Sequence, residues 1–208
     1  MQTLTSGNSH FNSAQLMIQI RARAQELGFS QIGVTGVERL HGAMPIVKRS
    51  IDLLWPTESA TQAFAESMAT QPALRNTYIV LCGDLGAGKT TFTRHLLRAL
   101  GVEGRIKSPT FAVVEPYEVG SLQIWHFDFY RFTNPREWAD AGFRDIFASD
   151  GLKLAEWPDK AAPNLPLADI VLQLEVMSDE SHESHDSRRA TVTAQTATGL
   201  TLMQGMQL

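Results

Sequence analysis

The hydrophobic positions of the chain follow two spacings, one typical of buried strands and one typical of amphipathic helices. The run 77–82 is apolar and rich in β-branched residues without alternation, which is typical of a strand covered on both faces of a parallel sheet. Shortly after it, the segment 90–100 places Phe92, Leu96 and Leu97 on one face at helical spacing. Gly101 is expected to end this helix.

The same two patterns predict further elements along the chain. Apolar or alternating runs predict strands at 29–37, 51–54, 111–114, 122–130, 152–155, 170–176 and 190–196. Helical spacing predicts helices at 13–28, 59–69 and 137–147. Residues 1–13 and 178–189 are polar and are expected to be a leader and a solvated loop. Strands interleaved with helices in this way predict an α/β fold.

The composition narrows the class of protein. The chain has 208 residues, 18 Lys and Arg against 22 Asp and Glu, and a formal net charge of −4. A protein whose main role is to grip nucleic acid usually has a basic surface, so this balance argues against that class and leaves room only for a local basic patch. The single cysteine, Cys82, excludes an internal disulfide and a cysteine-rich zinc or iron–sulfur site, and it fits a reduced compartment.

No segment has the length of a membrane span. The longest unbroken apolar run is about five residues, Tyr78 to Cys82, whereas a span needs about 20. Met1–Ser13 has neither the charged start nor the apolar core of a signal peptide. The sequence therefore predicts a soluble, cytoplasmic protein with no membrane partner.

Residues 83–91 carry the strongest chemical signal. The first eight match the P-loop pattern G-x-x-x-x-G-K-[ST], and the candidate nucleotide-binding set is Gly83, Asp84, Leu85, Gly86, Ala87, Gly88, Lys89, Thr90 and Thr91. Glycines allow a tight turn that exposes successive N–H groups to phosphate oxygens, and the following helix points its positive N-terminal end at them. Lys89 would contact the β- and γ-phosphates of ATP, and the Thr90 hydroxyl would bind Mg²⁺.

Three further residues complete a candidate catalytic set with Lys89. Asp128 ends an apolar strand in the manner of a Walker B acid and would help to hold Mg²⁺, unless it only caps the strand. Thr110 ends the segment Lys-Ser-Pro-Thr, which is either a nucleotide-sensing switch loop or a Ser-Pro turn. Glu156 follows the strand 152–155, where ligands of open α/β sheets lie. It would bind the metal, directly or through water, or orient the attacking water; the alternative is a surface carboxylate.

Other residues are weaker candidates. Trp157 either shields the site, contacts a partner or packs as an ordinary aromatic. His126 is interpreted as a packed core histidine, and His182 and His185 lie in a polar loop with nothing to fix a metal geometry. The guanine-recognition pattern Asn-Lys-x-Asp is absent from the sequence, which favours ATP over GTP.

Six motifs occur in a fixed order: GDLGAGKTTFT at 83–93, KSPT at 107–110, VEPY at 114–117, HFDFYR at 126–131, GFRDIF at 142–147 and EWP at 156–158. Over roughly residues 49–202 the chain resembles the TsaE (YjeE) family, bacterial P-loop ATPases of tRNA threonylcarbamoyladenosine biosynthesis. The resemblance implies a three-layer P-loop NTPase domain with a mostly parallel sheet.

The resemblance also implies partners and residue roles. The partners are the transferase subunits TsaD and TsaB, with tRNA held indirectly through their complex, and the target is the adenosine next to the anticodon in tRNAs that read codons beginning with A. Carried over by motif, Lys89 and Thr90 bind phosphate and Mg²⁺, Thr110 is the switch residue, and Asp128 and Glu156 serve the metal or the water. The segment 57–61 is expected near the adenine.

Residues 1–48 lie outside this resemblance. A boundary near Arg49 separates an N-terminal extension, 1–48, from the P-loop ATPase domain, 49–208. Within the extension, 13–40 resembles the start of epoxyqueuosine reductase, but the iron–sulfur cysteines of that enzyme are absent, so no such activity follows. An extended start of the chain or a gene-boundary remnant is at least an equal alternative.

Three functions remain open at this stage. The first is an ATPase within the tRNA-modification complex, slow when isolated because no arginine finger is evident in the sequence. The second is a P-loop kinase of small molecules, although no arginine cluster follows the P-loop helix at the spacing of a lid. The third is a nucleotide-gated assembly factor that binds ATP without needing to hydrolyse it.

Overall fold

The computed structural model of the chain describes residues 48–134, 136–177 and 187–206. The predicted extension, 1–48, lies outside the described residues except for Lys48, and with it the predicted helix 13–28 and strand 29–37. His182 and His185 also lie outside them. The fold below is that of the part that begins at Lys48.

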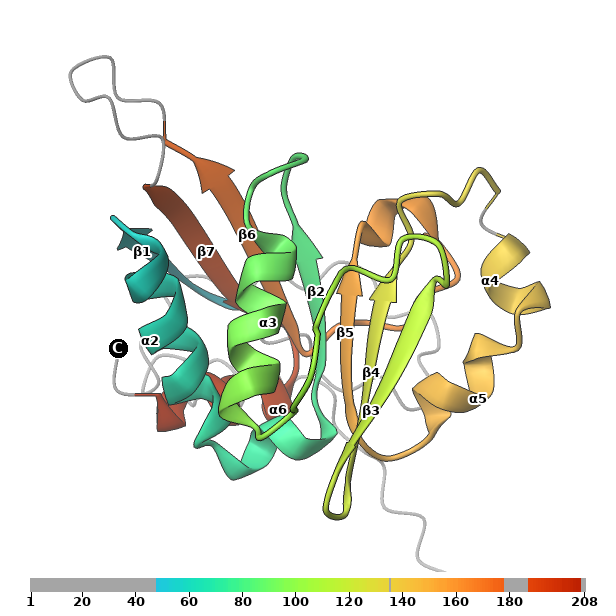
Figure 1. The fold of residues 1–208 in the computed structure, drawn as a ribbon, viewed down its shortest axis with the longest axis horizontal. Coiled ribbons are helices and arrows are strands. Elements are labelled where there is room, and N and C mark those ends of the chain that lie inside the picture. The colour runs from blue at the N-terminus through green and yellow to red at the C-terminus, as the bar shows by residue number, and fades with distance from the viewer. Residues whose placement is uncertain (1–47, 135, 178–186, 207–208) are drawn as a thin grey trace, which may run out of the picture. The chain divides into compact units, whose positions relative to one another are not determined.

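A seven-stranded mixed sheet forms the centre of this part (Figure 1). In order across the sheet, its strands are β1 (Arg49–Trp55), β7 (Arg188–Ala194), β6 (Ile170–Val176), β2 (Tyr78–Cys82), β5 (Leu152–Glu156), β4 (Leu122–Asp128) and β3 (Val114–Val119). The four strands from β6 to β4 are parallel to one another, whereas β1, β7 and β3 pair antiparallel with their neighbours. The predicted α/β class holds, and the mostly parallel sheet is correct for the central strands only.

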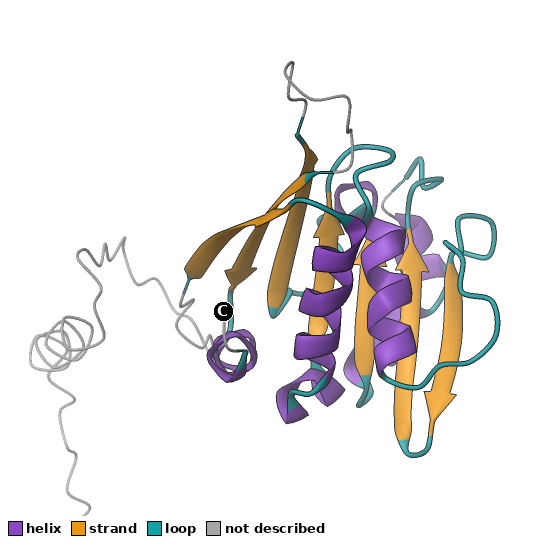
Figure 2. Ribbon diagram, turned by 60° about the vertical axis from the view of Figure 1, so that its left-hand side comes forward, coloured by secondary structure: helices purple, strands orange, loops and turns teal. Residues whose placement is uncertain are grey.

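Helices cover both faces of the sheet. The helix α2 (Glu58–Ala69) and the P-loop helix α3 (Lys89–Ala99) pack side by side on one face, and α6 (Ala197–Gly205) adds Leu202 and Met203 to the same apolar core (Figure 2). The short helices α4 (Arg136–Asp140) and α5 (Phe143–Ala148) contribute Trp138 and Phe143 to a separate core on the other face. Two short 3₁₀ helices, η1 (Pro72–Asn76) and η2 (Pro158–Lys160), complete the described elements.

The two cores explain the unbroken apolar character of β2. Ile79 and Leu81 belong to the core beneath α2 and α3, while Tyr78 and Val80 belong to the core on the opposite face. Successive side chains of a strand point to opposite faces, so a strand between two cores must be apolar at every position. The prediction of a doubly covered parallel strand at 77–82 is confirmed in this respect.

Some predicted elements are wrong in detail. Residues 111–113 form a turn rather than a strand, because the Val113 N–H turns back to the Pro109 carbonyl and Val113 adopts a left-handed φ of 69°. The predicted helix 137–147 is interrupted at Gly142, whose φ is +73°, and forms α4 and α5 instead. Arg188 and Arg189, assigned to a loop, belong to β7. Helix α6 was not predicted at all.

The parallel strands bring their carboxyl ends to one edge of the sheet, at the top in Figure 1. The glycine loop after β2, the loop before β3 and the segments that follow β4 and β5 all meet at this edge, and α3 starts there. In open α/β sheets ligands bind at such an edge.

None of the described helices is long and apolar enough to cross a membrane.

Three aromatic rings join the first strand to the two main helices, and they allow a test of the core. The Phe92 ring is fully buried, 6.3 Å from the Trp55 ring and 6.1 Å from the Phe64 ring between centroids. We expect Phe92→Ala to lower the free energy of unfolding by about 3–5 kcal/mol, because it leaves a cavity among these rings. Urea denaturation followed by circular dichroism measures the change.

The matched control is Phe111→Ala, since Phe111 is 88% exposed and its ring contacts only the Arg131 guanidinium among the interactions described for it. An exposed cation–π contact is worth about 0.5–1 kcal/mol, so this variant is expected to lose no more than that. Equal losses for the two variants would contradict the burial of Phe92 among these rings.

Candidate functional site

The glycine loop has the backbone shape of a phosphate-binding turn. It joins β2 to α3, and Gly83, Gly86 and Gly88 have φ values of +134°, +81° and +108°. Residues with a Cβ rarely adopt such angles. A Cβ on Gly83 would also lie 2.3 Å from the Leu174 carbonyl oxygen of β6, so the loop approaches the neighbouring strand as closely as glycine allows. Gly88 precedes the first turn of α3, whose N-terminal end therefore faces the edge of the sheet.

Lys89 lies beneath this loop and is almost fully buried. Its Nζ donates hydrogen bonds to the carbonyls of Gly83 at 2.6 Å and Asp84 at 2.8 Å, and it lies 4.0 Å from the centre of the Trp157 ring. Burial lowers the pKa of Lys89, and the nearby carboxylates, first of all Glu156, act in the opposite direction. The site therefore contains an ammonium group held by carbonyl oxygens and an aromatic face, at the position predicted for a phosphate contact.

Thr90 and Glu156 are joined directly. The Thr90 hydroxyl lies 2.9 Å from Oε1 and 3.0 Å from Oε2 of Glu156. Glu156 is the last residue of β5, and the pairing of β4 with β5 places it beside Asp128, the last residue of β4. Both carboxylates are buried. The structure thus brings Thr90, Asp128 and Glu156 together from α3 and two adjacent strand ends.

Asp128 connects this group to the loop that carries Thr110. The hydroxyls of Thr110 and Ser108 both donate to Asp128 Oδ2, the Thr110 bond being 2.7 Å long, and the Tyr130 N–H donates to Oδ1 at 2.9 Å. The two hydroxyls are themselves 2.7 Å apart. The segment 107–110 is therefore tied to the carboxylate at the end of β4.

These residues line one cavity of about 300 Å³ at the edge of the sheet. Its walls include Leu85, Gly86, Gly88, Lys89, Thr90, Thr91, Ser108, Thr110, Asp128, Tyr130, Glu156 and Trp157. Gly83, Asp84 and Ala87 belong to the same loop but do not line it, and Leu85 is 80% exposed.

The oxygen donors in this cavity fit magnesium. Mg²⁺ prefers oxygen ligands and is usually bound through one or two carboxylates together with phosphate oxygens and water. Thr90, Asp128 and Glu156 supply a hydroxyl and two carboxylates, and Lys89 beside them is suited to phosphate. Among the described residues no group of three or more His, Cys, Asp or Glu side chains could enclose a metal by itself.

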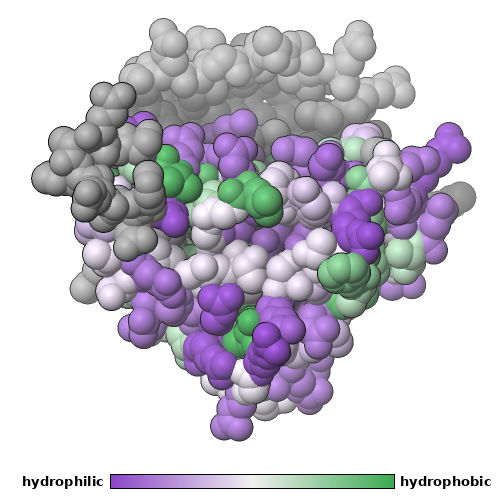
Figure 3. Space-filling view, turned by 45° about the horizontal axis from the view of Figure 1, so that its top comes forward, coloured by the Kyte–Doolittle hydropathy of each residue, from purple (hydrophilic) through white to green (hydrophobic). Residues whose placement is uncertain are grey.

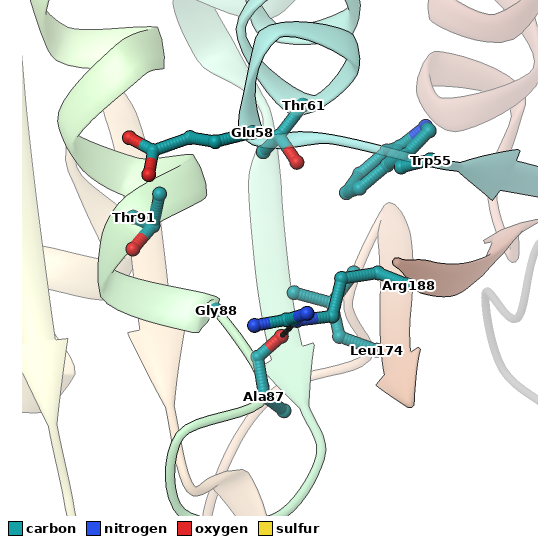
Figure 4. A pocket seen from close by; sticks show the side chains of 8 residues that line it. All are labelled: Trp55, Glu58, Thr61, Ala87, Gly88, Thr91, Leu174 and Arg188. Carbon is teal, nitrogen blue, oxygen red and sulfur yellow. Dashed lines mark hydrogen bonds between the residues drawn. The ribbon is translucent and has the colours of Figure 1, made fainter. Parts of the chain in front are cut away.

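A second cavity of about 130 Å³ lies on the other side of the loop (Figure 4). It shares Gly88 and Thr91 with the first cavity, and Trp55, Glu58 and Thr61 reach it from β1 and α2. Leu174 and Arg188 close it from β6 and β7. The predicted segment 57–61 therefore contributes to a cavity that adjoins the P-loop.

Three residues near these cavities were missed or undervalued in the sequence. Arg188, expected in a loop, donates from Nε to the Ala87 carbonyl at 3.2 Å (Figure 4). Ser108 contacts Asp128 together with Thr110. His126, interpreted as a core histidine, is fully buried but lies 2.9 Å from Glu156 Oε1. The one sequence signal for His126 is its spacing of two from Asp128, which places both residues on the same face of one strand.

The surface at this edge is polar for the most part. Figure 3, with the top of Figure 1 turned forward, shows separate hydrophobic patches among polar side chains rather than one continuous apolar face. Leu85 and Phe111 are the most exposed large hydrophobic residues of the described part.

The family model for "Threonylcarbamoyl adenosine biosynthesis protein TsaE" matches residues 55–189, which include every residue that lines the two cavities. The chain belongs to the TsaE family. The predicted resemblance is therefore confirmed.

The chain is also similar in sequence to individual TsaE proteins. The chain is 41% identical over 116 residues to tRNA threonylcarbamoyladenosine biosynthesis protein TsaE of Haemophilus influenzae, covering 56% of this chain and 73% of that protein. It is 35% identical over 127 residues to the TsaE protein of Synechocystis, covering 57% and 76%. The crystal structure of YdiB from Bacillus subtilis superposes with a TM-score of 0.62 at 26% identity, covering 77% of this chain and 95% of YdiB.

The close approach of Gly83 to β6 leads to a prediction. We expect Gly83→Ala to lower the free energy of unfolding by about 1–2 kcal/mol for the left-handed backbone and by about 1–3 kcal/mol more for the contact with the Leu174 carbonyl. Urea denaturation measures the loss, and a nucleotide titration shows whether the loop still binds.

Gly104→Ala is the matched control, because Gly104 has a φ of +82° but no atom within 4 Å of an added Cβ. It is expected to show the backbone cost alone. If both variants lose the same stability, Gly83 is required for its φ and the approach to β6 has no energetic importance.

Proposed function

We propose that this TsaE family member is a magnesium-dependent ATPase whose ATP cycle serves the formation of threonylcarbamoyladenosine in tRNA. The observation that carries the proposal is the convergence of Lys89, Thr90, Asp128 and Glu156 in one cavity, with the Thr90 hydroxyl bonded to Glu156. A hydroxyl, two carboxylates and a lysine at the start of a P-loop helix are the groups that ATP hydrolysis requires.

Each of these residues has a role in keeping with its contacts. Lys89 binds the β- and γ-phosphates and neutralises the negative charge that develops on them. Thr90 and Asp128 would hold Mg²⁺, and Glu156 would hold it directly or through water, or orient the attacking water. When bound, the metal supplies Lewis-acid stabilisation of the phosphate oxygens. Trp157, whose ring faces Lys89 at 4.0 Å, limits the access of solvent to the ammonium group.

The loop 107–110 would respond to the nucleotide. Ser108 and Thr110 both donate to Asp128 Oδ2, so any ligand that competes for this carboxylate changes the contacts of the loop. Switch loops of P-loop proteins are ordered by the γ-phosphate and its metal and are released after hydrolysis. We assign Thr110 to this sensing role.

The second cavity is suited to the nucleoside. It adjoins the first through Gly88 and Thr91, and it offers an aromatic ring, Trp55, beside the polar side chains of Glu58 and Thr61. A purine needs an apolar contact surface with a few placed hydrogen-bonding groups. The adenine of ATP would therefore lie between α2 and the P-loop, with its phosphates extending into the larger cavity.

The isolated protein is expected to be a slow enzyme. No arginine is among the described residues that line the cavity at Lys89, and P-loop enzymes without an arginine at the γ-phosphate hydrolyse on the order of 10⁻⁴ per second. We propose that TsaD and TsaB, the transferase subunits with which it would act, accelerate this step, and that tRNA is bound through them.

Two variants test the enzymatic role. We expect Lys89→Ala to abolish both nucleotide binding and hydrolysis, because it removes the cation under the loop. Glu156→Ala is expected to lower the rate by about 10²–10³-fold while it still binds ATP. Phosphate release and equilibrium nucleotide binding are measured for both, with Glu118→Ala, an exposed carboxylate on β3, as the control.

The outcome also separates the alternative functions. Transfer of phosphate to a metabolite instead of water would indicate a kinase. If Glu156→Ala fully supports tRNA modification without hydrolysing ATP, the protein is a nucleotide-gated assembly factor.

The partner proposal has its own test. We expect the chain to be retained by immobilised TsaD and TsaB more strongly with ATP and Mg²⁺ than without them, because the Asp128 contacts of loop 107–110 would report the nucleotide state. Association is measured in pull-downs, and the modification of tRNA is scored in parallel. Association that does not respond to nucleotide would contradict this role.

A further inference from the structure

His126 lies inside the sheet directly behind the candidate site. It occupies β4 two residues before Asp128. His126 is fully buried, and Glu156 is 2% exposed. Its Nε2 atom is 2.9 Å from Glu156 Oε1. His126 does not line the cavity that contains Lys89, so it reaches the site only through Glu156.

The surroundings of the ring fix where its proton lies. Nδ1 is buried and has no hydrogen-bond partner among the described residues. A proton on Nδ1 would leave a buried donor without an acceptor and would set the lone pair of Nε2 against a carboxylate oxygen. A proton on Nε2 makes a hydrogen bond to Glu156 and leaves only a lone pair unpaired. The Nε2–H form is therefore the one that this environment stabilises.

The two partners of Glu156 hold its carboxylate from two sides. Thr90 Oγ1 is within 3.0 Å of both carboxylate oxygens, and it has a single proton to donate. The bond from His126 is made to Oε1 alone. Within the described part of the chain, Oε2 has Thr90 as its only hydrogen-bond partner, so the bond from His126 leaves Oε2 as the less engaged of the two oxygens.

We propose that His126 is a positioning residue: its Nε2–H fixes the rotation of the Glu156 carboxylate so that Oε2 remains presented to the cavity. This inference rests on the proposed function, because the orientation matters only if Glu156 serves the metal or the water there. Residues that orient a ligand or base from behind commonly change activity or metal affinity by about 10–100-fold when they are replaced.

Two substitutions separate positioning from packing. His126→Leu fills much of the same space but cannot donate to Glu156, and His126→Gln offers an amide donor. We expect His126→Leu to lower kcat for ATP hydrolysis by about 10–100-fold with little change in KM for ATP, and His126→Gln to recover most of the loss. The Mg²⁺ concentration that supports half-maximal ADP binding is expected to rise in His126→Leu and to return toward the original value in His126→Gln.

The control for strand stability is Ile124→Val. Ile124 is a fully buried residue on the same face of β4, two positions before His126. Its substitution changes packing without touching the Glu156 carboxylate, so kcat and the Mg²⁺ dependence are expected to be unaffected. Circular dichroism shows that each variant is folded under the assay conditions.

A spectroscopic measurement tests the contact without any nucleotide. The ¹⁵N and ¹H signals of the imidazole in the wild-type chain are expected to show a proton on Nε2 and none on Nδ1. A proton on Nδ1 alone would overturn the inference, as would a His126→Leu variant with unchanged kcat and Mg²⁺ dependence. If the wild-type chain neither binds nor hydrolyses ATP, the proposed function fails, and the imidazole signals still decide whether His126 donates to Glu156.

Discussion

The hydrogen bond between the Thr90 hydroxyl and the Glu156 carboxylate is the contact on which the arrangement of the site depends. It joins the first turn of α3 to the end of β5, and the two bonded residues are 66 positions apart in the chain. Because Asp128 is paired with Glu156 across β4 and β5, the same bond also fixes the distance from the P-loop to the second carboxylate. A shift of α3 along the sheet would break it.

The site concentrates charge in a place with little water. Glu156, Asp128 and Lys89 are each at most 5% exposed, and burying such groups is costly unless they are paired and hydrogen-bonded. The structure meets this condition with hydroxyl, imidazole and backbone donors to the carboxylates and with carbonyl acceptors for the ammonium group. Each of the three charged side chains is thus held by at least two hydrogen bonds, which restricts its orientation.

Local patterns were sufficient to predict which residues lie together at the centre of the candidate site. The P-loop is a contiguous motif, and Asp128 and Glu156 each follow an apolar strand, so the rule that parallel strands end at one edge was enough to bring them together. The contact of His126 depends on the relative register of β4 and β5, which no local pattern contains. Arg188 was missed for a related reason, because β7 begins earlier than its alternation indicates.

Helix α6 could not be predicted from the sequence for a different reason. Its sequence, Ala-Thr-Gly-Leu-Thr-Leu-Met-Gln-Gly, is rich in residues with weak helix propensity. The helix forms because Leu202 and Met203 pack into the core and because Thr196 caps its first turn through a bond from the Gly199 N–H. Tertiary packing therefore outweighs local preference at this position.

The left-handed Val113 stores backbone strain in the loop before β3. A β-branched residue in that region of backbone space stores about 1–3 kcal/mol, and here it is held by the bonds from its N–H to Pro109 and from the Asp128 N–H to its carbonyl. The loop therefore contains strained backbone. It is joined to the end of β4 by a main-chain hydrogen bond as well as by the hydroxyls of Ser108 and Thr110. Any rearrangement that returns Val113 to extended backbone recovers the stored amount, so releasing the loop costs less than the number of bonds broken would indicate.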